Sequence, residues 1–569
     1  MNSSGKINYS LRRYPLLRTG VVVFVIALVF AAISIIKNKT KKVPEIESIN
    51  PPVGSPGDVV LITGKNFGDV KDMSYVEIAG SKLTSSSYIS WTDTSIKLVL
   101  PANIQDGLVV VGRKNMRSKP ALFANEVDIP VPVTNVQQET KPFVTEINPS
   151  KAYVGQEIVI EGSNFGESRN QSKVVFTIDY DNKIKNSDIM SLALYTDNMI
   201  GGNEDEFDYI SWSDKEIVVR VPDGACSGVL VVDTGKEKSV AKEINIKNDS
   251  GYKEFSNKKI YLIQYSADIA DVVAKDFASI TLRCPLPVVS CGQPKVEVTE
   301  TSSTPILMNY QNNLIHQISK IRNNSPKKTF NQTFVLTVYE VNTHVNPDKI
   351  GNYKDVNQNL LEKTLVQDNL VPSENEEVVK LSREIVGQES NPYKKALLIY
   401  NYMTDNFKVS QNLRKNDANP VDLINLKKGD SYDFAVLYTA LLRAAGIPSL
   451  TDSGILISSD LTSQAHWWCE FYIDRVGWIP VDPALGSGLE YKKWTDSETE
   501  NYRDYYFGNL DSHHVTFSRG WKELKPFNAE NKIVVQPKSF ALQSIWEESD
   551  ENTVKYSSYW GTPVVKGVY

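Results

Sequence analysis

Three residues in the C-terminal half of the chain have the types and the order that acyl-transfer chemistry needs. Ser431 lies in the run LKKGDSYDFAVLYTALLRAAGIP, His466 lies in AHWWCEFYI, and Asp482 lies in GWIPVDPA. A nucleophile, an imidazole base and a carboxylate that orients the base are the parts of a catalytic triad. The pattern predicts Ser431 as the nucleophile, His466 as the base and Asp482 as the orienting group.

A helix must position the first of these residues. Asp430 is a good N-cap, apolar residues follow it at helical spacing, and Gly446 and Pro448 end the run. These signals place Ser431 in the first turn of a helix. A side chain at that position gains from the helix dipole and from free backbone N–H groups, which can form an oxyanion hole.

Two short strands must carry His466 and Asp482. A two-residue turn at Arg475 and Val476 places the two side chains on opposite faces, whereas a three-residue loop places them on one face. The sequence leaves both open. Cys469 is an alternative nucleophile on the first strand, but side chains alternate along a strand, so it points away from the face of His466. We expect Cys469 to be a buried structural residue.

The sequence predicts neither a metal site nor a cofactor site. His513 and His514 are adjacent and therefore point apart in a strand, while His316 and His344 have no ligand-like neighbours. There is no Gly-rich phosphate loop and no paired CxxC motif.

Length and composition limit the classes of protein to which this chain can belong. The chain has 569 residues, which is longer than a domain with a single hydrophobic core, and this length indicates three to five domains. With 62 basic against 68 acidic residues, a dedicated nucleic-acid binder is excluded. Four cysteines cannot form a disulfide framework. Cys284 and Cys291 bracket the short loop RCPLPVVSC, and an oxidising compartment would allow a disulfide there, which the spacing alone does not decide.

The helix run, HWWCE, GWIPVDP and the later YYFGNLDSHHVTFSRG resemble the transglutaminase-like family of the papain-like cysteine superfamily. The resemblance implies an α+β core, a base at His466, an orienting Asp482, and a cleft supported by Asp430 and Trp468. The family has a cysteine where this chain has Ser431. A thiol has a pKa of about 8.5 and ionises readily beside an imidazole, whereas a serine hydroxyl does not. We therefore expect a catalytically silent site, with weak serine-dependent hydrolysis as the alternative.

Two further stretches repeat one pattern. Residues 44–101 contain PEIESINPPVGSPGDVVLITGKNFGD and YISWTDTSIKLVLP, and residues 142–222 contain PFVTEINPSKAYVGQEIVIEGSNFGE and YISWSDKEIVVRVP. Alternating apolar runs between Gly, Pro and Asn indicate the strands of a sandwich. The pattern resembles the immunoglobulin-like TIG/IPT domain, over residues 45–130 and 142–248, and this resemblance implies a spacer or binding module.

Three features of the repeats have an alternative interpretation. Trp91 and Trp212 are residue types that contact carbohydrate or protein, but we expect buried sandwich tryptophans. The second copy has an insertion near 186–207 whose acidic end could bind a cation, and we expect a solvated loop.

An apolar run precedes the repeats. Residues 19–36 carry no charge and would span about 27 Å as a helix, at about 1.5 Å per residue. A cleaved secretory signal would need a shorter apolar region and a cleavage site, which Ala32-Ile33-Ser34 resembles only weakly. We expect an uncleaved signal anchor. Basic residues are balanced on its two sides, so orientation rests on analogy with surface modules, which places residues 43–569 outside the cytoplasm of a bacterium.

The expected protein is multidomain and membrane-anchored, and its core binds a protein, peptide or cell-envelope ligand without turnover. The alternative is an active amide hydrolase or crosslinker that uses Ser431, His466 and Asp482. The sequence gives no oligomeric state. The predicted order is a basic segment (1–18), a transmembrane anchor (19–36), two all-β TIG/IPT sandwiches (45–130 and 142–248), a β-rich domain (258–370), an α+β transglutaminase-like core (375–530) and a C-terminal extension (531–569).

Overall fold

The chain divides into two compact units in the computed structural model, Met1–Val131 with Phe527–Ala529 and Pro132–Pro526 with Glu530–Tyr569. The structure describes residues 19–20, 23–29, 43–71, 74–101, 104–105, 107–125, 141–184, 198–353, 356–415, 418–494, 501–524, 526, 531–535, 538–542 and 545–569.

The predicted anchor is described only in part. Residues 19–20 and 23–29 are helical, whereas the rest of 19–36 and the basic segment 1–18 lie outside the described residues. Among the described residues, no helix has both the length and the apolar character needed to cross a membrane.

The first unit contains the predicted first sandwich. Its core holds Val60, Ile62, Phe67 and Ile96. Val60, Ile62 and Ile96 alternate with less buried residues along their strands, as a sandwich strand requires. One sheet has the order β1(Glu45–Asn50), β3(Val59–Lys65), β7(Ser95–Val99), β6(Tyr88–Trp91). The other has the order β2(Val53–Gly54), β10(Ala121–Asn125), β8(Gly107–Arg113), β4(Ser74–Ile78), β5(Ser81–Lys82), with β9(Met116–Arg117) paired to β8.

The second sandwich repeats this topology at the start of the second unit. One sheet has the order β11(Phe143–Asn148), β13(Glu157–Ser163), β17(Glu216–Arg220), β16(Tyr209–Trp212). The other has the order β12(Lys151–Ala152), β19(Lys242–Ile246), β18(Gly228–Asp233), β14(Lys173–Thr177), β15(Met199–Gly201). In both copies the tryptophan is partly rather than fully buried. Trp91 Nε1 donates to the Phe67 carbonyl over 3.3 Å, and Trp212 Nε1 donates to the Phe165 carbonyl over 3.1 Å.

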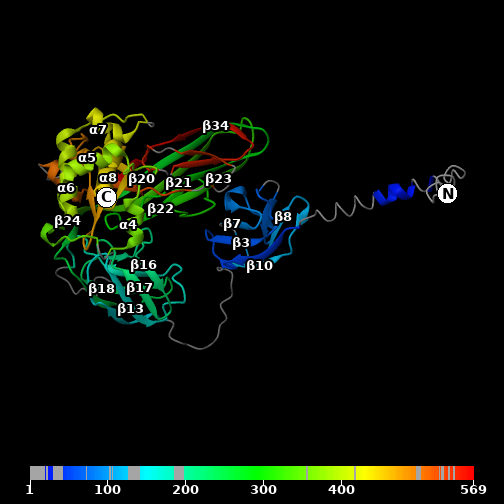
Figure 1. Cartoon of the computed structure of the whole chain (residues 1–569), viewed down its shortest axis with the longest axis horizontal. Coiled ribbons are helices and arrows are strands. Elements are labelled where there is room, and N and C mark those ends of the chain that lie inside the picture. Colours follow the sequence, from blue (N-terminus) through cyan, green and yellow to red (C-terminus); the bar gives the residue numbers. More distant parts are fainter. Residues whose placement is uncertain are drawn as a thin grey trace, which may run out of the picture. The chain divides into compact units, whose positions relative to one another are not determined.

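The predicted β-rich domain is built from two sheets, and the end of the chain completes both. The red strand β34 lies along the green strand β20 in Figure 1. One sheet has the order β22(Lys295–Thr301), β24(Lys328–Val345), β20(Gly251–Ala274), β34(Thr553–Trp560), with β30(Asn509–Leu510) on β24 and β35(Val564–Val568) on β20. The other has the order β23(Asn313–Ile321), β21(Ala278–Pro285), β33(Trp546–Ser549), β32(Lys532–Val535).

The cysteines of this region do not form the disulfide that the loop allowed. Cys284 and Cys291 are not joined by a disulfide. Cys284 is packed in the core of the β-rich domain, whereas the Cys291 thiol contacts the Asp223 carboxylate at 3.5 Å.

The α+β core places helices against one sheet of four antiparallel strands. That sheet has the order β29(Gly477–Val481), β28(Ser463–Ile473), β27(Ser449–Ile457), β31(His514–Arg519), and a short pair joins β25(Lys408–Val409) to β26(Lys428–Gly429). The α-helices are α4(Gln358–Leu365), α5(Glu376–Val386), α6(Pro392–Asn406), α7(Leu423–Leu426), α8(Ser431–Ala444), α9(Pro483–Gly486) and α10(Tyr502–Tyr505).

Two local features fix the core around the predicted triad. Helix α8 begins at Ser431 as predicted, because the Asp430 side chain accepts from the Asp433 N–H while the Asp433 side chain accepts from the Asp430 N–H. Strands β28 and β29 pair Ile473 with Gly477, which leaves a three-residue loop. This is the alternative that turns His466 and Asp482 to the same face.

Candidate active site

His466 and Asp482 meet on the face of the core sheet that is opposite to Cys469. The distance from His466 Nε2 to Asp482 Oδ2 is 2.5 Å, and both side chains are fully buried. The other carboxylate oxygen of Asp482 accepts from the backbone N–H groups of Ala484 and Leu485, at 3.0 and 2.8 Å, because Asp482 caps α9. The carboxylate is therefore fixed with one oxygen directed at the imidazole.

A second histidine, which the sequence did not place in the site, shares the same carboxylate. His514 Nε2 lies 3.2 Å from Asp482 Oδ2, and His514 Nδ1 lies 2.7 Å from Asp511 Oδ1. Asp511 accepts a further hydrogen bond of 2.7 Å from the Tyr506 hydroxyl. The available signal was the spacing of Asp511 and His514 within YYFGNLDSHHVTFSRG.

Gly454 lies in a tightly packed part of the sheet beside the cluster. It lies on β27, where it pairs with His466 of β28 and with Thr516 of β31. The ring centroids of His466 and His514 are 5.5 Å apart. An added Cβ at Gly454 would lie 1.8 Å from the Val515 carbonyl oxygen and 3.0 Å from the Trp468 ring. A side chain does not fit there.

The charges of this cluster support each other. The neighbouring imidazoles overcome burial and hold the pKa values of Asp482 and Asp511 below the ordinary range of a carboxyl. Burial opposes the charged form of His514, but the carboxylates of Asp511 and Asp482 outweigh it and raise the pKa of His514 to about 9. His514 is therefore a cation at neutral pH.

Trp468 packs against His466 and His514, whereas His513 packs against Trp494. Trp468 is buried and stacks on His466, with ring centroids 6.0 Å apart, and its edge meets His514 at 5.1 Å. His513 points away, as predicted for neighbours in a strand, and stacks on Trp494 at 4.7 Å. The sequence prediction for His514 considered only the adjacent pair, whereas the partners of His514 are Asp511 and, from another strand end, Asp482.

Ser431 lies at the start of α8, beside the strand that carries His466. Tyr432 follows Ser431 and Trp467 follows His466, and the centroids of these two rings are 5.5 Å apart. Ser431 is buried, and among the described residues no hydrogen bond joins its hydroxyl to His466, whose Nδ1 is buried without a partner. The structure thus brings His466 and Asp482 together, but it joins neither to the Ser431 hydroxyl by a hydrogen bond among the described residues.

A lysine from the C-terminal extension closes over the start of α8. Lys538 Nζ lies 2.5 Å from Asp430 Oδ2 and donates to the Arg414 carbonyl over 3.2 Å. Its ammonium also lies over the Tyr432 ring, 5.1 Å from the centroid. Both flanks of Ser431 therefore contact Lys538, which is 107 positions further along the chain.

Cys469 is the buried structural residue that strand alternation predicts. Its thiol donates to the Ala435 carbonyl of α8 over 3.1 Å, and burial raises its pKa well above the ordinary value. It faces the helix, away from His466.

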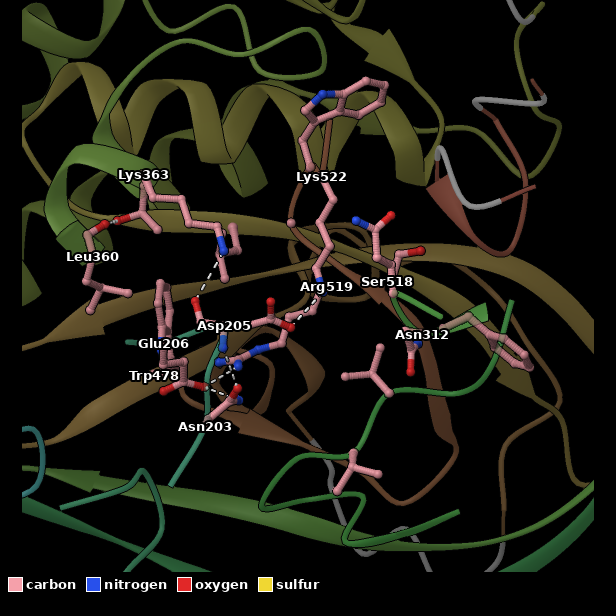
Figure 2. Close-up of a pocket in the computed structure, with 18 of the residues that line it drawn as sticks. Asn203, Asp205, Glu206, Asn312, Leu360, Lys363, Trp478, Ser518, Arg519 and Lys522 are labelled. Carbon is pink, nitrogen blue, oxygen red and sulfur yellow. Dashed lines mark hydrogen bonds and ion pairs between the residues drawn. The ribbon is translucent and has the colours of Figure 1, made fainter. Parts of the chain in front are cut away.

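At the acidic end of the second sandwich's insertion, Glu204 and Asp205 are exposed, as expected for a solvated loop, whereas Glu206 is largely buried. Figure 2 shows Asp205 and Glu206 turned toward Arg519 and Lys522 of the core, around a cavity of about 240 Å³. Glu206 pairs with Arg519, and Asp205 lies 2.6 Å from Lys522. These ion pairs dock the sandwich on the core. Residues 185–197 of the insertion lie outside the described residues.

Family models match these regions. The transglutaminase-like superfamily model matches residues 379–483, and the IPT/TIG domain model matches residues 44–124 and 142–184. The chain carries IPT/TIG domains followed by a transglutaminase-like core. This core contains Ser431, His466 and Asp482.

Individual relatives cover parts of the chain. An uncharacterized protein of Haemophilus influenzae is 28% identical over 179 residues, which are 26% of this chain and 48% of the relative. A cyclomaltodextrin glucanotransferase of Paenibacillus macerans is 27% identical over 124 residues, 22% of this chain and 16% of that enzyme. The chain thus spans about half the length of the first relative. The crystal structure of the periplasmic domain of TgpA from Pseudomonas aeruginosa aligns at 12% identity with a TM-score of 0.23, over 40% of this chain and 87% of that domain.

Proposed function

We propose that this protein is a binding protein of the cell surface or envelope, whose transglutaminase-like core holds a protein, peptide or envelope ligand without turnover. The observation that carries the proposal is the state of Ser431, which is buried and makes no hydrogen bond to His466 among the described residues. A serine hydroxyl attacks only when a base removes its proton during the attack. A serine in place of a thiolate, with no hydrogen bond to the base among the described residues, supports binding rather than catalysis.

The proposal includes the location. The uncharged run 19–36 supports a membrane anchor, with residues 43–569 outside the cytoplasm. Protease added to intact cells should then cleave the protein. Full protection of residues 43–569, with cleavage after the cells are opened, would contradict this orientation.

The alternative function is acyl transfer through Ser431, His466 and Asp482. The observation that favours it is the fixed pair of His466 and Asp482, with Nδ1 of His466 buried and free of partners. A base held in one tautomer by a carboxylate is what a serine nucleophile needs, and catalytic hydrogen bonds often tighten only with substrate bound.

One assay separates the two functions. The purified full-length chain, Ser431→Ala and Ser431→Cys are compared for hydrolysis of glutamine amides and for amine incorporation, in the presence of EDTA. We expect the wild type and Ser431→Ala to match the rate without protein. Turnover in the wild type that disappears in Ser431→Ala would overturn the binding proposal.

The cysteine variant tests the rest of the site. Activity in Ser431→Cys would show that only the nucleophile was lost, and this is compatible with a binding protein that descends from an enzyme. The same substitution combined with Cys469→Ala is the matched control, because activity that persists there belongs to position 431 and not to the buried native thiol.

A further inference from the structure

Three potential metal-ligand atoms converge on the face of the core sheet that carries His466. His466 Nε2, Asp482 Oδ2 and His514 Nε2 all lie within 4.8 Å of one another, and all three side chains are buried. Two imidazoles and one carboxylate form a ligand set that transition-metal sites use, whereas Ca²⁺ and Mg²⁺ prefer oxygen ligands alone.

The groups behind the ligands are arranged as in a metal site. His514 Nδ1 lies 2.7 Å from Asp511, a carboxylate–histidine pair that leaves Nε2 directed at the site, and Tyr506 in turn holds Asp511. The second oxygen of Asp482 is occupied by two backbone N–H groups, which leaves Oδ2 for the centre. Two of the three ligand atoms, on Asp482 and His514, are therefore oriented from outside the cluster, whereas Nδ1 of His466 has no partner among the described residues.

The charge of the cluster favours a divalent cation. Asp482 and Asp511 are two buried carboxylates, and among the described residues neither pairs with a lysine or arginine. When both imidazoles are neutral, as metal ligation requires, a divalent ion balances the two carboxylates.

A small cavity adjoins the cluster. It has a volume of about 40 Å³, and Trp468, Asp511 and His514 are among the residues that line it. This volume exceeds the space that one water molecule needs, so a metal-bound water has room beside His514.

We propose that His466, Asp482 and His514 bind one divalent transition-metal ion. The ion would replace the two hydrogen bonds to Asp482 Oδ2 with metal–ligand bonds of about 2.0–2.2 Å. Because His466 Nε2 would then be a ligand, its orientation by Asp482 as in a triad would be lost. The site goes beyond the proposed function and does not depend on it, since a binding protein and an enzyme that is inactivated by the ion could both contain it.

The test measures metal content directly. The full-length chain is stripped with EDTA and dialysed against Zn²⁺, and bound zinc is determined by mass spectrometry for the wild type, His514→Gln and His513→Gln. The adjacent His513 is the matched control because it stacks on Trp494 and contributes no atom to the proposed ligand set, although its Nδ1 lies 3.5 Å from Asp511 Oδ1. We expect one zinc per chain in the wild type and His513→Gln, and at least a hundredfold loss of affinity in His514→Gln.

A second measurement keeps the result independent of folding in the variants. Co²⁺ bound to the wild type should give the visible absorption of a four- or five-coordinate ion, and Asp511→Asn should weaken Zn²⁺ binding by about 10–100-fold. Equal zinc in the wild type and His514→Gln, no zinc in the wild type, or displacement of zinc by Ca²⁺ would each overturn the proposal. An active wild type in EDTA would overturn the proposed function but leave this site intact.

Discussion

The candidate site has two halves, the start of α8 with Ser431 and the sheet face with His466. The pKa values of aspartates are shifted in opposite directions in the two halves. At the start of α8, Asp430 and Asp433 lie close together, and burial followed by the Asp430 carboxylate raises the pKa of Asp433 to about 6. Across the sheet, Asp482 and Asp511 lie beside imidazoles, and their pKa values are lowered. A carboxylate next to another carboxylate resists ionisation, whereas one next to a cation favours it.

The difference teaches what each half is built to do. The half that contains Ser431 is closed by Lys538 and by the reciprocal hydrogen bonds of the helix cap. The half that contains His466 holds an oriented cluster of two carboxylates and two imidazoles. The first half is organised for stability, and the second half keeps the groups that bind a proton or a metal ion.

The largest expected effect on stability is that of Lys538→Met, at the start of α8. This change leaves the Asp430 carboxylate buried without its cation, and we expect a loss of about 3–5 kcal/mol in the free energy of unfolding, measured with denaturant. The double variant Asp430→Asn with Lys538→Met should recover most of the loss, and the exposed Lys555→Met should have almost no effect. If the halves are independent, folded Lys538→Met still binds zinc, and loss of zinc in that variant would link them.

The second half should be sensitive to Gly454→Ala. The added methyl group would collide with the Val515 carbonyl and with Trp468, so β27 and β31 must move apart. We expect a loss of about 3 kcal/mol together with weaker zinc binding. Gly351→Ala is the control, because a Cβ there meets nothing within 4 Å. Unchanged stability and zinc affinity in Gly454→Ala would show that the imidazoles do not need this close approach.

The smallest expected effect is a pH dependence of the unfolding free energy that Asp433, in the first half, would cause. The pKa of Asp433 is higher in the folded state than its ordinary value of 3.8, so its contribution to stability is complete below that value and is lost as the pH rises through about 6. The unfolding free energy of the wild type, relative to Asp433→Asn, should fall by about 1–2 kcal/mol between pH 4 and pH 7, with screening included. A rise over this range would contradict the contrast between the two halves.

Local signals in the sequence were sufficient for much of the fold. The two copies of the YISW pattern marked both sandwiches, and strands of the β-rich domain lie where Val, Thr and Tyr alternate. The cap at Asp430 and the stop at Gly446 bounded α8. These elements were predictable because capping, alternation and turn chemistry act between residues a few positions apart.

Pairings between distant segments could not be predicted in this way. The strands of residues 546–568 join β20 and β21, which lie more than 250 positions earlier. Glu206 meets Arg519 across a domain boundary, although each looked like an ordinary surface residue. Nothing in the local sequence of either partner specifies the other.

The sequence by itself determined the elements and the types of reactive side chain: a serine at a helix start, a histidine and an aspartate on neighbouring strands. Tertiary structure alone decided their relations. The three-residue loop at 474–476 turned Asp482 toward His466, strand β31 brought His514 to the same carboxylate, and Lys538 closed the start of α8. The reason is that hydrogen bonds and ion pairs depend on distances of a few ångströms in space, which spacing along the chain does not fix across separate strands.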